Sequence, residues 1–341
     1  MENIYNIFKF NKYISREAYE SEFNKNHPIK GDILMTRIGD IGTPALITKD
    51  IDIAYYVSLA RISLFYKALP EYMYFYIQTS QFQHELWKKT IHVAFPKKIN
   101  KEDIGECKVK LFSIKKQKEI SKILIAIENR ILTQKKIINN LCSLINGIIN
   151  ECFSEKGLYK EGRLVPLKDI LLEGNKVSVD TKAYQKITIK LKKEGVVFSN
   201  ITREMSDTRP FYLREKGELI IGKQNYFNGS IAVITEEYDQ TICSNAIMSF
   251  KIKDSYNKEF IYHCISNDLF LKYRSHLANG TGQKELSEKD FLSFVIRLPD
   301  QFTQESIVRK IALVTSKLDI EKKILLLYEK QKQYLLGKLF I

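Results

Sequence analysis

The sequence lacks the motifs of several enzyme classes that act on DNA or nucleotides. It has no Pro-Pro dipeptide, so it cannot contain the Asn/Asp-Pro-Pro motif that DNA methyltransferases place against a flipped base. It also contains neither GxGxxG nor GxxxxGKS/T, which leaves no recognisable dinucleotide or ATP site. The segment Asn279-Gly280-Thr281-Gly282 is rich in glycine, but Lys284 follows too soon for a phosphate-binding loop. We therefore expect no catalytic residue and no cofactor in this chain.

Cysteine, histidine and long apolar runs are scarce as well. The five cysteines are odd in number and form no CxxC pair, which fits reduced thiols in a cytoplasm better than a disulfide framework or a zinc site. The five histidines show no ligand spacing, so we expect no metal site. No run approaches the roughly 18 apolar residues of a membrane span, and no secretory signal is visible at the start. These absences predict a cytoplasmic protein.

Positive charge is abundant. The formal net charge is +14, which makes an acidic polymer a plausible partner, and nucleic acid is the first candidate. A second explanation stays open, because only 11 of the 54 basic residues are Arg. Heavy use of Lys, Ile and Asn can also reflect an AT-rich coding bias.

The chain contains an internal repeat with a period of 187 residues. Residues 117–153 align without a gap on residues 304–340, so that Ile120 corresponds to Ile307 and Phe153 to Phe340. A duplication of this kind predicts two similar modules, each made of a variable segment followed by a long helix.

Both copies carry apolar residues at alternating steps of four and three, the a/d pattern of a coiled coil. The predicted seam positions are Ile120, Leu124, Ile127, Ile131, Ile138, Leu141 and Ile145 in the first copy, and Ile307, Ile311, Val314, Leu318, Leu325, Tyr328 and Leu335 in the second. Each helix spans about 37 residues, or about 55 Å, which is longer than a module of this size can cover. The economical partner for each helix is therefore the other copy, packed antiparallel.

A polar residue interrupts the seam at one equivalent position in each copy, namely Gln134 and Glu321. Such a pair could fix the register of the helices at some cost in stability. The alternative is a local shift of the seam onto Ile137 and Ile324. Glu321 also belongs to a Glu-x-Lys triplet that follows Pro299-Asp300, but a metal-dependent nuclease site cannot easily gather its carboxylates on such a seam.

The segments between the helices have mixed patterns. Alternating or β-branched runs predict strands at 32–37, 55–63, 198–201, 218–221, 230–234 and 246–251, and helices are predicted at 72–79 and 258–265. We predict an α+β fold with a first module at 1–113, a central helix at 114–153, a second module at 154–300 and a distal helix at 301–341.

With these features, the chain resembles the specificity subunit of type I restriction–modification systems. The resemblance rests on the duplicated heptad helix "QKEISKILIAIENRILTQKKI", on "LLGKLF" near the end, on Lys30 to Leu34 followed by "RIGDIG", and on "KQNYFNGSIAVI" in the second module. In that family each variable module is a target-recognition domain for one half of a split DNA sequence. The helices act as a ruler and dock two methyltransferase subunits, and a motor-nuclease subunit can join.

The resemblance implies that this subunit has no catalytic activity. S-adenosylmethionine would be held by the methyltransferase partners, and ATP and Mg by the motor-nuclease partner. The partners would flip an adenine in each half-site. One departure is clear, because the second module has 62 residues from Ser154 to the Lys216-Gly217 turn and the first has only 29 before Lys30. We expect the first module to be N-terminally incomplete, without a counterpart of Arg163 to Ile170.

Residues that read DNA should be basic or amide side chains near strand ends, since Arg and Lys suit guanine or phosphate and Asn and Gln suit adenine. The predicted contacts of the second module are Lys223, Gln224, Asn225, Tyr226 and Asn228, with Arg203, Arg209 and Lys284 as further candidates. Those of the first module are Thr36, Arg37, Lys97 and Lys98. A polar hairpin with no role beyond turning the chain is the alternative for residues 223–228.

Two other functions stay open. The chain could be a coiled-coil scaffold, or an inactive fragment, that binds a methyltransferase without reading DNA. It could also be the recognition subunit of a related bipartite restriction enzyme whose nuclease and methylase are fused.

Overall fold

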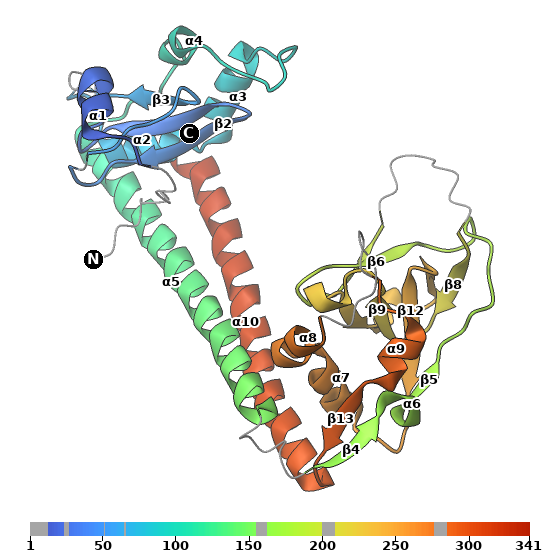
Figure 1. The fold of residues 1–341 in the computed structure, drawn as a ribbon. Helices are drawn as coiled ribbons and strands as arrows, with labels where there is room; N and C mark the ends of the chain where they lie inside the picture. The colour runs from blue at the N-terminus through green and yellow to red at the C-terminus, as the bar shows by residue number, and fades with distance from the viewer. Residues whose placement is uncertain are drawn as a thin grey trace. The chain divides into compact units, whose positions relative to one another are not determined.

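The computed structural model describes residues 13–23, 27–50, 52–64, 66–154, 162–199, 209–275 and 285–341. The chain divides into two compact units, residues 1–139 with 319–341 and residues 140–318. Each unit contains one α+β module and part of each of two long helices (Figure 1). The module boundaries predicted from the sequence stay a prediction.

The first unit is built on a three-stranded antiparallel sheet in the order β2-β1-β3. Its strands are β1 (Ile33–Ile38), β2 (Asp40–Leu46) and β3 (Leu59–Ile62). Gly39, with φ of 80°, makes the tight turn between the first two strands because a side chain is disfavoured at that backbone angle. Four helices accompany the sheet: α1 (Arg16–Phe23), α2 (Pro70–Ile77), α3 (Ser80–Lys89) and α4 (Lys101–Gly105).

Helix α2 forms the centre of the first core. Its residues from Tyr72 to Ile77 are all buried, which requires neighbours on every side. The core that surrounds it takes residues from the sheet, from α3 and the segment around α4, from the beginning of one long helix and from the end of the other. Phe340, near the chain's end, packs against the Tyr72 ring at a centroid distance of 5.2 Å.

The second unit repeats this plan and adds to it. Its main sheet has the order β10-β9-β12-β5, formed by β10 (Ile231–Val233), β9 (Leu219–Gly222), β12 (Ile247–Ile252) and β5 (Leu171–Glu173). The helices of its core are α6 (Leu167–Ile170), α7 (Lys258–Ser266), α8 (Asp268–Arg274) and α9 (Glu288–Ser293). Strand β9 lies between β10 and β12 as β1 lies between β2 and β3, so the weak repeat seen in the modules is confirmed.

Three small two-stranded sheets complete the second unit. They pair β4 (Arg163–Pro166) with β13 (Val295–Leu298), β6 (Ile187–Ile189) with β7 (Val196–Phe198), and β8 (Phe211–Arg214) with β11 (Thr241–Ser244). Two short 3-10 turns, η2 (Tyr226–Asn228) and η3 (Glu236–Tyr238), link neighbouring strands. Among the described residues of the first unit, β3 has no partner on the side where β12 has β5.

The two long helices, α5 (Ile114–Phe153) and α10 (Gln301–Leu339), pack antiparallel, as predicted. The start of α5 and the end of α10 lie in the first core, and the end of α5 and the start of α10 lie in the second. The seam residues Ile120, Leu124, Ile127, Ile131, Ile307, Ile311 and Leu318 are buried, and the others are half-buried.

Gln134 and Glu321 both stay on the seam. They are 5% and 6% exposed, whereas Ile137 is 37% exposed, so the seam does not shift onto the isoleucines. The Gln134 side-chain amide donates to the backbone carbonyl of Glu321 at 3.0 Å and also to the Glu321 carboxylate. Lys332, which interrupts the seam of the second copy, lies 2.6 Å from the carboxylate of Glu128.

No helix in the described part of the chain is both long and apolar enough to span a bilayer.

Candidate nucleic-acid interface

A cleft of about 280 Å³ in the second unit gathers several of the residues predicted to contact DNA. Arg209, Lys223, Gln224 and Asn225 line it, although Arg209 is separated from the others by more than a dozen residues of sequence. Further lining comes from the ends of β6, β8, β11 and β12, with polar side chains from Lys186, Thr188, Ser199, Ser230 and Ser244. The cleft therefore joins basic, amide and hydroxyl groups, the types that recognise bases and phosphates.

The turn after β9 is what presents these side chains. Asn225 precedes η2, and its carbonyl accepts hydrogen bonds from the backbone N–H groups of Asn228 and Ser230, each at 3.0 Å. The Asn228 side chain donates to the Asn225 side-chain oxygen at 3.1 Å. Gly229, with φ of 78°, ends the turn. Gln224, Asn225 and Asn228 remain exposed, so their free polar atoms face solvent.

Lys223 is anchored at its backbone and partly neutralised at its side chain. Its N–H donates to Ala246 and its carbonyl accepts from Leu286, at 3.0 and 2.9 Å. Its ammonium lies 3.9 Å from the carboxylate of Glu288, which also pairs with Lys176 at 2.6 Å. Lys223 thus has a fixed position between the cleft and an acidic neighbour that the sequence pattern did not reveal.

Tyr226 requires a correction. The prediction placed it at the DNA surface, but its side chain is 0% exposed and its hydroxyl donates to the backbone carbonyl of Ile265 at 2.6 Å. Its ring meets Phe291 edge to face at 5.3 Å, and burial raises the pKa of the Tyr226 hydroxyl well above its usual range. The residue turns inward because η2 points it into the core, so it supports the turn without reaching a ligand.

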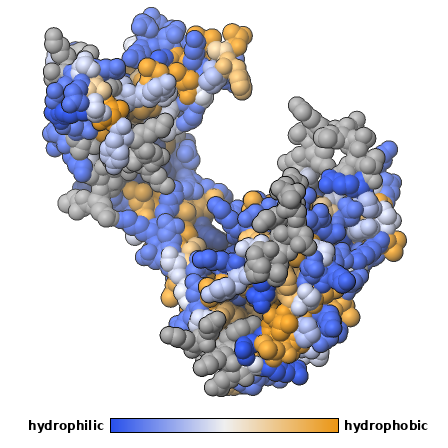
Figure 2. All heavy atoms as spheres, in the orientation of Figure 1, coloured by the Kyte–Doolittle hydropathy of each residue, from blue (hydrophilic) through white to orange (hydrophobic). Residues whose placement is uncertain are grey.

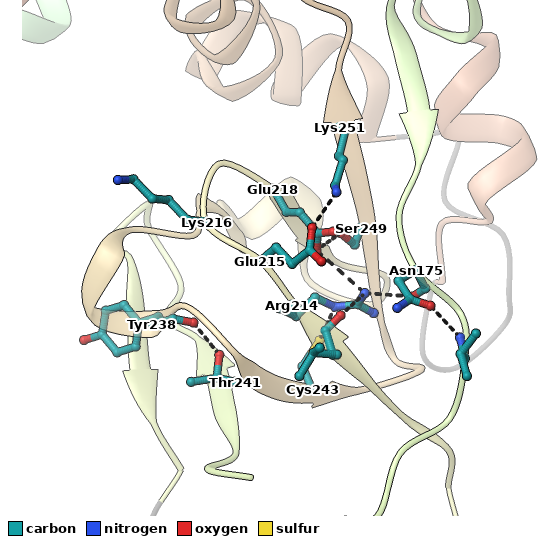
Figure 3. Close-up of polar contacts among 12 residues, drawn as sticks. Asn175, Arg214, Glu215, Lys216, Glu218, Tyr238, Thr241, Cys243, Ser249 and Lys251 are labelled. Atoms are coloured by element: carbon teal, nitrogen blue, oxygen red, sulfur yellow. Dashed lines mark hydrogen bonds and ion pairs between the residues drawn. The ribbon is translucent and has the colours of Figure 1, made fainter.

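The second unit also contains a buried ion pair that the sequence did not reveal (Figure 3). Arg214 of β8 and Glu218, just before β9, are both fully buried, with 3.8 Å between guanidinium nitrogen and carboxylate oxygen. Ser249 of β12 donates to Glu218 at 2.8 Å, and Arg214 Nε lies 3.0 Å from the sulfur of Cys243 in β11. Burial is the main cause of the raised pKa of the Cys243 thiol. The cluster ties together β8, β11 and β12, three of the strands that contribute to the cleft, and the start of β9.

The first unit has a similar acid-base contact. Asp32, which follows the Lys30-Gly31 turn as Glu218 follows Lys216-Gly217, is buried and lies 3.7 Å from Arg61 of β3. Because the Arg comes from a different strand in each unit, no simple sequence spacing could have revealed the shared role.

The four predicted DNA contacts of the first unit meet at one end of the β1–β2 hairpin. Two of them are engaged within the fold: the Thr36 hydroxyl accepts from Thr43 N–H at 2.9 Å, and Arg37 donates to the carbonyls of Val57 and Ile99 at 2.8 and 3.0 Å. Lys97 and Lys98 are exposed. The remaining two candidates, Arg203 and Lys284, lie outside the described residues, and their role stays a prediction.

The described ranges contain no cluster of three or more side chains able to hold a metal ion. The acidic Asp300 instead caps α10, where it accepts from the Thr303 hydroxyl at 2.7 Å and from the Thr303 backbone N–H at 3.0 Å. These bonds, the hydroxyl one first, lower the pKa of its carboxyl. Glu321 bonds to Gln134, so these two acids serve the helices.

The sequence matches the model of a known protein family. The family model described as "Type I restriction modification DNA specificity domain" matches residues 3–142 and 159–327, which is most of the chain and covers both copies of the repeat. None of the curated proteins compared matches the sequence.

Solved structures give the same fold at low identity. The S subunit of a type I restriction–modification system from M. genitalium is 16% identical, with a TM-score of 0.56 over 93% of this chain and 85% of that one. A structure described as the basis of complex assembly and conformational transition of the type I system is 14% identical, with a TM-score of 0.54 over 92% of this chain and 82% of that one.

Proposed function

Because this chain belongs to the family of the type I restriction–modification DNA specificity domain, we propose that it reads a DNA target in two parts and docks two methyltransferase subunits on its long helices. It is a non-catalytic DNA specificity subunit of a type I system. Below we propose the surfaces of the chain that carry that role, the partners that bind to them and the way in which the DNA target is divided.

The observation that carries the proposal for DNA is the cleft of the second unit. Arg209 and the consecutive residues Lys223, Gln224 and Asn225 line it from two separate segments, and their amide and cationic groups match base edges and phosphates. The first unit offers Lys97 and Lys98 near the β1–β2 turn for its half-site. Since the cleft side chains differ from the residues at the equivalent turn in the first unit, the two half-sites differ in sequence.

The observation for docking is an apolar flank along the two helices. Ile320, Leu327 and Tyr334 of α10 are spaced by seven and are 52%, 62% and 65% exposed. If Leu124 and Ile131 of α5 are assigned to heptad position a, the repeat puts Ile311 and Leu318 of α10 at position a as well. Ile320, Leu327 and Tyr334 then occupy position c. Ile123 and Ile137 of α5, at the adjoining position g, are exposed as well. Apolar residues repeated every seven positions and left in water suit a further helix.

The opposite flank carries an ion pair and only one comparably exposed apolar side chain of α10, Leu326 at position b, so it lacks a repeated apolar row among the described residues. Lys135 and Glu329, both at position e, lie 3.3 Å apart across the helices. We assign the apolar flank to helices of the methyltransferase subunits. Those subunits would bring S-adenosylmethionine, and a motor-nuclease subunit would bring ATP and Mg. The assembly would act in the cytoplasm.

The helices would also set the spacing of the target. Helix α5 is continuous over 40 residues and α10 over 39, so each is about 60 Å long at 1.5 Å per residue. A ruler of fixed length between two readers leaves a stretch of unread bases of fixed length between the half-sites.

Co-expression with an adenine methyltransferase subunit tests the proposal. A tagged copy of this chain should recover the methyltransferase as a stable complex, and the complex should methylate adenines of a split motif in duplex DNA. Recovery of the complex without any methylation of DNA would favour the second candidate, a scaffold or inactive fragment. That candidate draws support from the smaller described sheet of the first unit, which has three strands where the second has four.

A further inference from the structure

We propose that residues 92–97 of the first unit form an apolar wedge that inserts Phe95, with Val93 beside it, between stacked bases of the DNA target. The inference rests on the proposed function, because it presumes that this unit meets DNA. It goes beyond that function by assigning a mode of contact, distortion of the duplex, to one unit only.

The loop has a fixed base. The N–H of Ile91 donates to the carbonyl of Lys98 and the N–H of Gly39 donates to the carbonyl of Lys97, both at 2.8 Å. The N–H of Ile99 donates to the carbonyl of Arg37 at 3.0 Å. The bond to Gly39 therefore holds the loop against the β1–β2 turn, and the bond between Ile91 and Lys98 joins the two ends of the loop. A wedge needs such a base, since a loose segment would lose conformational freedom on insertion.

The tip of the loop is apolar and fully in water. Val93 is 97% exposed and Phe95 103%, and Pro96 is exposed as well. Figure 2 shows apolar atoms where the chain projects beyond α3 in the first unit. Trp87, Tyr56 and Val57 of this unit are exposed too, but Val93 and Phe95 are the most exposed of its large apolar side chains among the described residues. Phe and Pro are among the side chains that architectural proteins use to unstack base steps.

The charge next to the tip selects nucleic acid as the occupant. Lys97 and Lys98 follow the tip directly, and in the described part of the chain neither one forms an ion pair. Two nearby lysines of α3 are neutralised instead, Lys88 by Glu85 at 3.1 Å and Lys89 by Glu106 at 2.6 Å. An apolar tip with unpaired cations at its base matches a base step flanked by phosphates.

The repeat shows that the wedge is particular to the first module. By the 187-residue offset, Val93 corresponds to Gly280 and Phe95 to Gly282, while Lys97 corresponds to Lys284. The basic position is thus common to both copies, and the apolar tip is not. We infer that distortion of the duplex by an apolar tip belongs to the first module only.

The test uses the complex of this chain with methyltransferase and a DNA duplex that contains the split motif methylated by that complex. The duplex carries a fluorophore at each end, so that bending is measured by energy transfer. The wild-type complex should bend this duplex. The variant Val93→Gly/Phe95→Gly, which installs the residues of the second module, should lose most of the bend. It should bind about tenfold more weakly, with the same dependence on salt, because its phosphate contacts remain.

Two control variants separate the contributions. Lys97→Ala/Lys98→Ala should lower the slope of log affinity against log salt by about two, because two phosphate contacts are lost. Phe302→Ala, which removes an exposed Phe elsewhere, should behave as wild type. Melting temperatures should not change for any of these, since the mutated side chains lie on the surface.

Unchanged bending and affinity in the double glycine variant would overturn the wedge while leaving the proposed function intact. Loss of methyltransferase from that variant, with DNA contact unaltered, would assign the loop to a protein partner and also overturn it. A wild-type complex that binds no DNA defeats both the wedge and the proposed function.

Discussion

Gln134 and Glu321 are equivalent residues of the two repeats, and they hydrogen-bond to each other. Their separation of 187 residues is the period of the duplication itself. A residue meets its own counterpart only where the axis that relates two copies passes between them, as in a two-fold symmetric dimer. The pair therefore marks the pseudo-symmetry axis of the antiparallel helices. At this axis the Gln134 side-chain amide donates a hydrogen bond to the Glu321 carboxylate.

Removal of one partner from this pair should be costly. We expect Gln134→Leu to lower the free energy of unfolding by about 3 kcal/mol, because it removes the Gln134 amide from a buried carboxylate and puts an apolar side chain in its place. The exchange Gln134→Glu/Glu321→Gln should restore most of the stability, since the same bond can form in the opposite direction. Urea denaturation of the full chain measures both. Equal losses in the single and the exchanged variant would show that the two residues do not act as a pair.

The apolar flank should control assembly without controlling folding. Ile320→Lys/Leu327→Lys introduces two charges where a partner helix would pack, so recovery of methyltransferase should fall at least tenfold. Melting temperature should change little, because both side chains already face water. Asn139→Lys/Gln333→Lys places the same charges at position b, on the other side of the helices, and should leave recovery unchanged. Equal effects of the two double variants would refute the assignment of the flank.

The cleft of the second unit should control DNA binding without controlling assembly. Alanine at Lys223, Gln224 and Asn225 should weaken binding to the target duplex by about tenfold or more, since a good base contact contributes about 1–3 kcal/mol. Methyltransferase should still co-purify. Lys216→Ala removes the same charge from a lysine that is paired with Glu236, and it serves as the control. Fluorescence anisotropy with labelled duplex is the measurement, and wild-type affinity in the triple variant would exclude these residues.

His263 should make the second unit sensitive to acid. Burial, with a smaller contribution from the charge of Lys193, lowers the pKa of His263 from an ordinary value near 6.5 to about 4. Below about pH 6.5, His263 therefore binds a proton in the unfolded chain but stays neutral in the folded chain. Stability should be complete above that pH and fall as the pH drops toward 4, by up to about 3 kcal/mol. His263→Gln should remove this part of the slope in urea denaturation measured from pH 7.5 to 4.5. A slope that survives the substitution would assign it to other groups.

The sequence predicted the parts of the fold that depend on periodicity. The heptads gave both long helices and their antiparallel pairing, and the 187-residue offset gave the shared plan of β1, β2 and β3 with β9, β10 and β12. It missed the small sheets of the second unit, whose strands are only three or four residues long and too short to show alternation. Tyr226 was misplaced because a 3-10 turn reverses which side chains point inward. The Arg214–Glu218 pair was missed because its burial depends on strands brought together from distant segments.

The central claim is that this chain selects the DNA sequence that its partners methylate. Long-read detection of methylated adenines tests it most directly, in cells that carry the gene, in cells that lack it, and in cells with alanine at Lys223, Gln224 and Asn225. The account predicts a split motif that is methylated with the gene and unmethylated without it. The alanine variant should lose methylation of that motif or methylate a motif altered in one half. An identical pattern of methylated adenines in all three strains would contradict the claim.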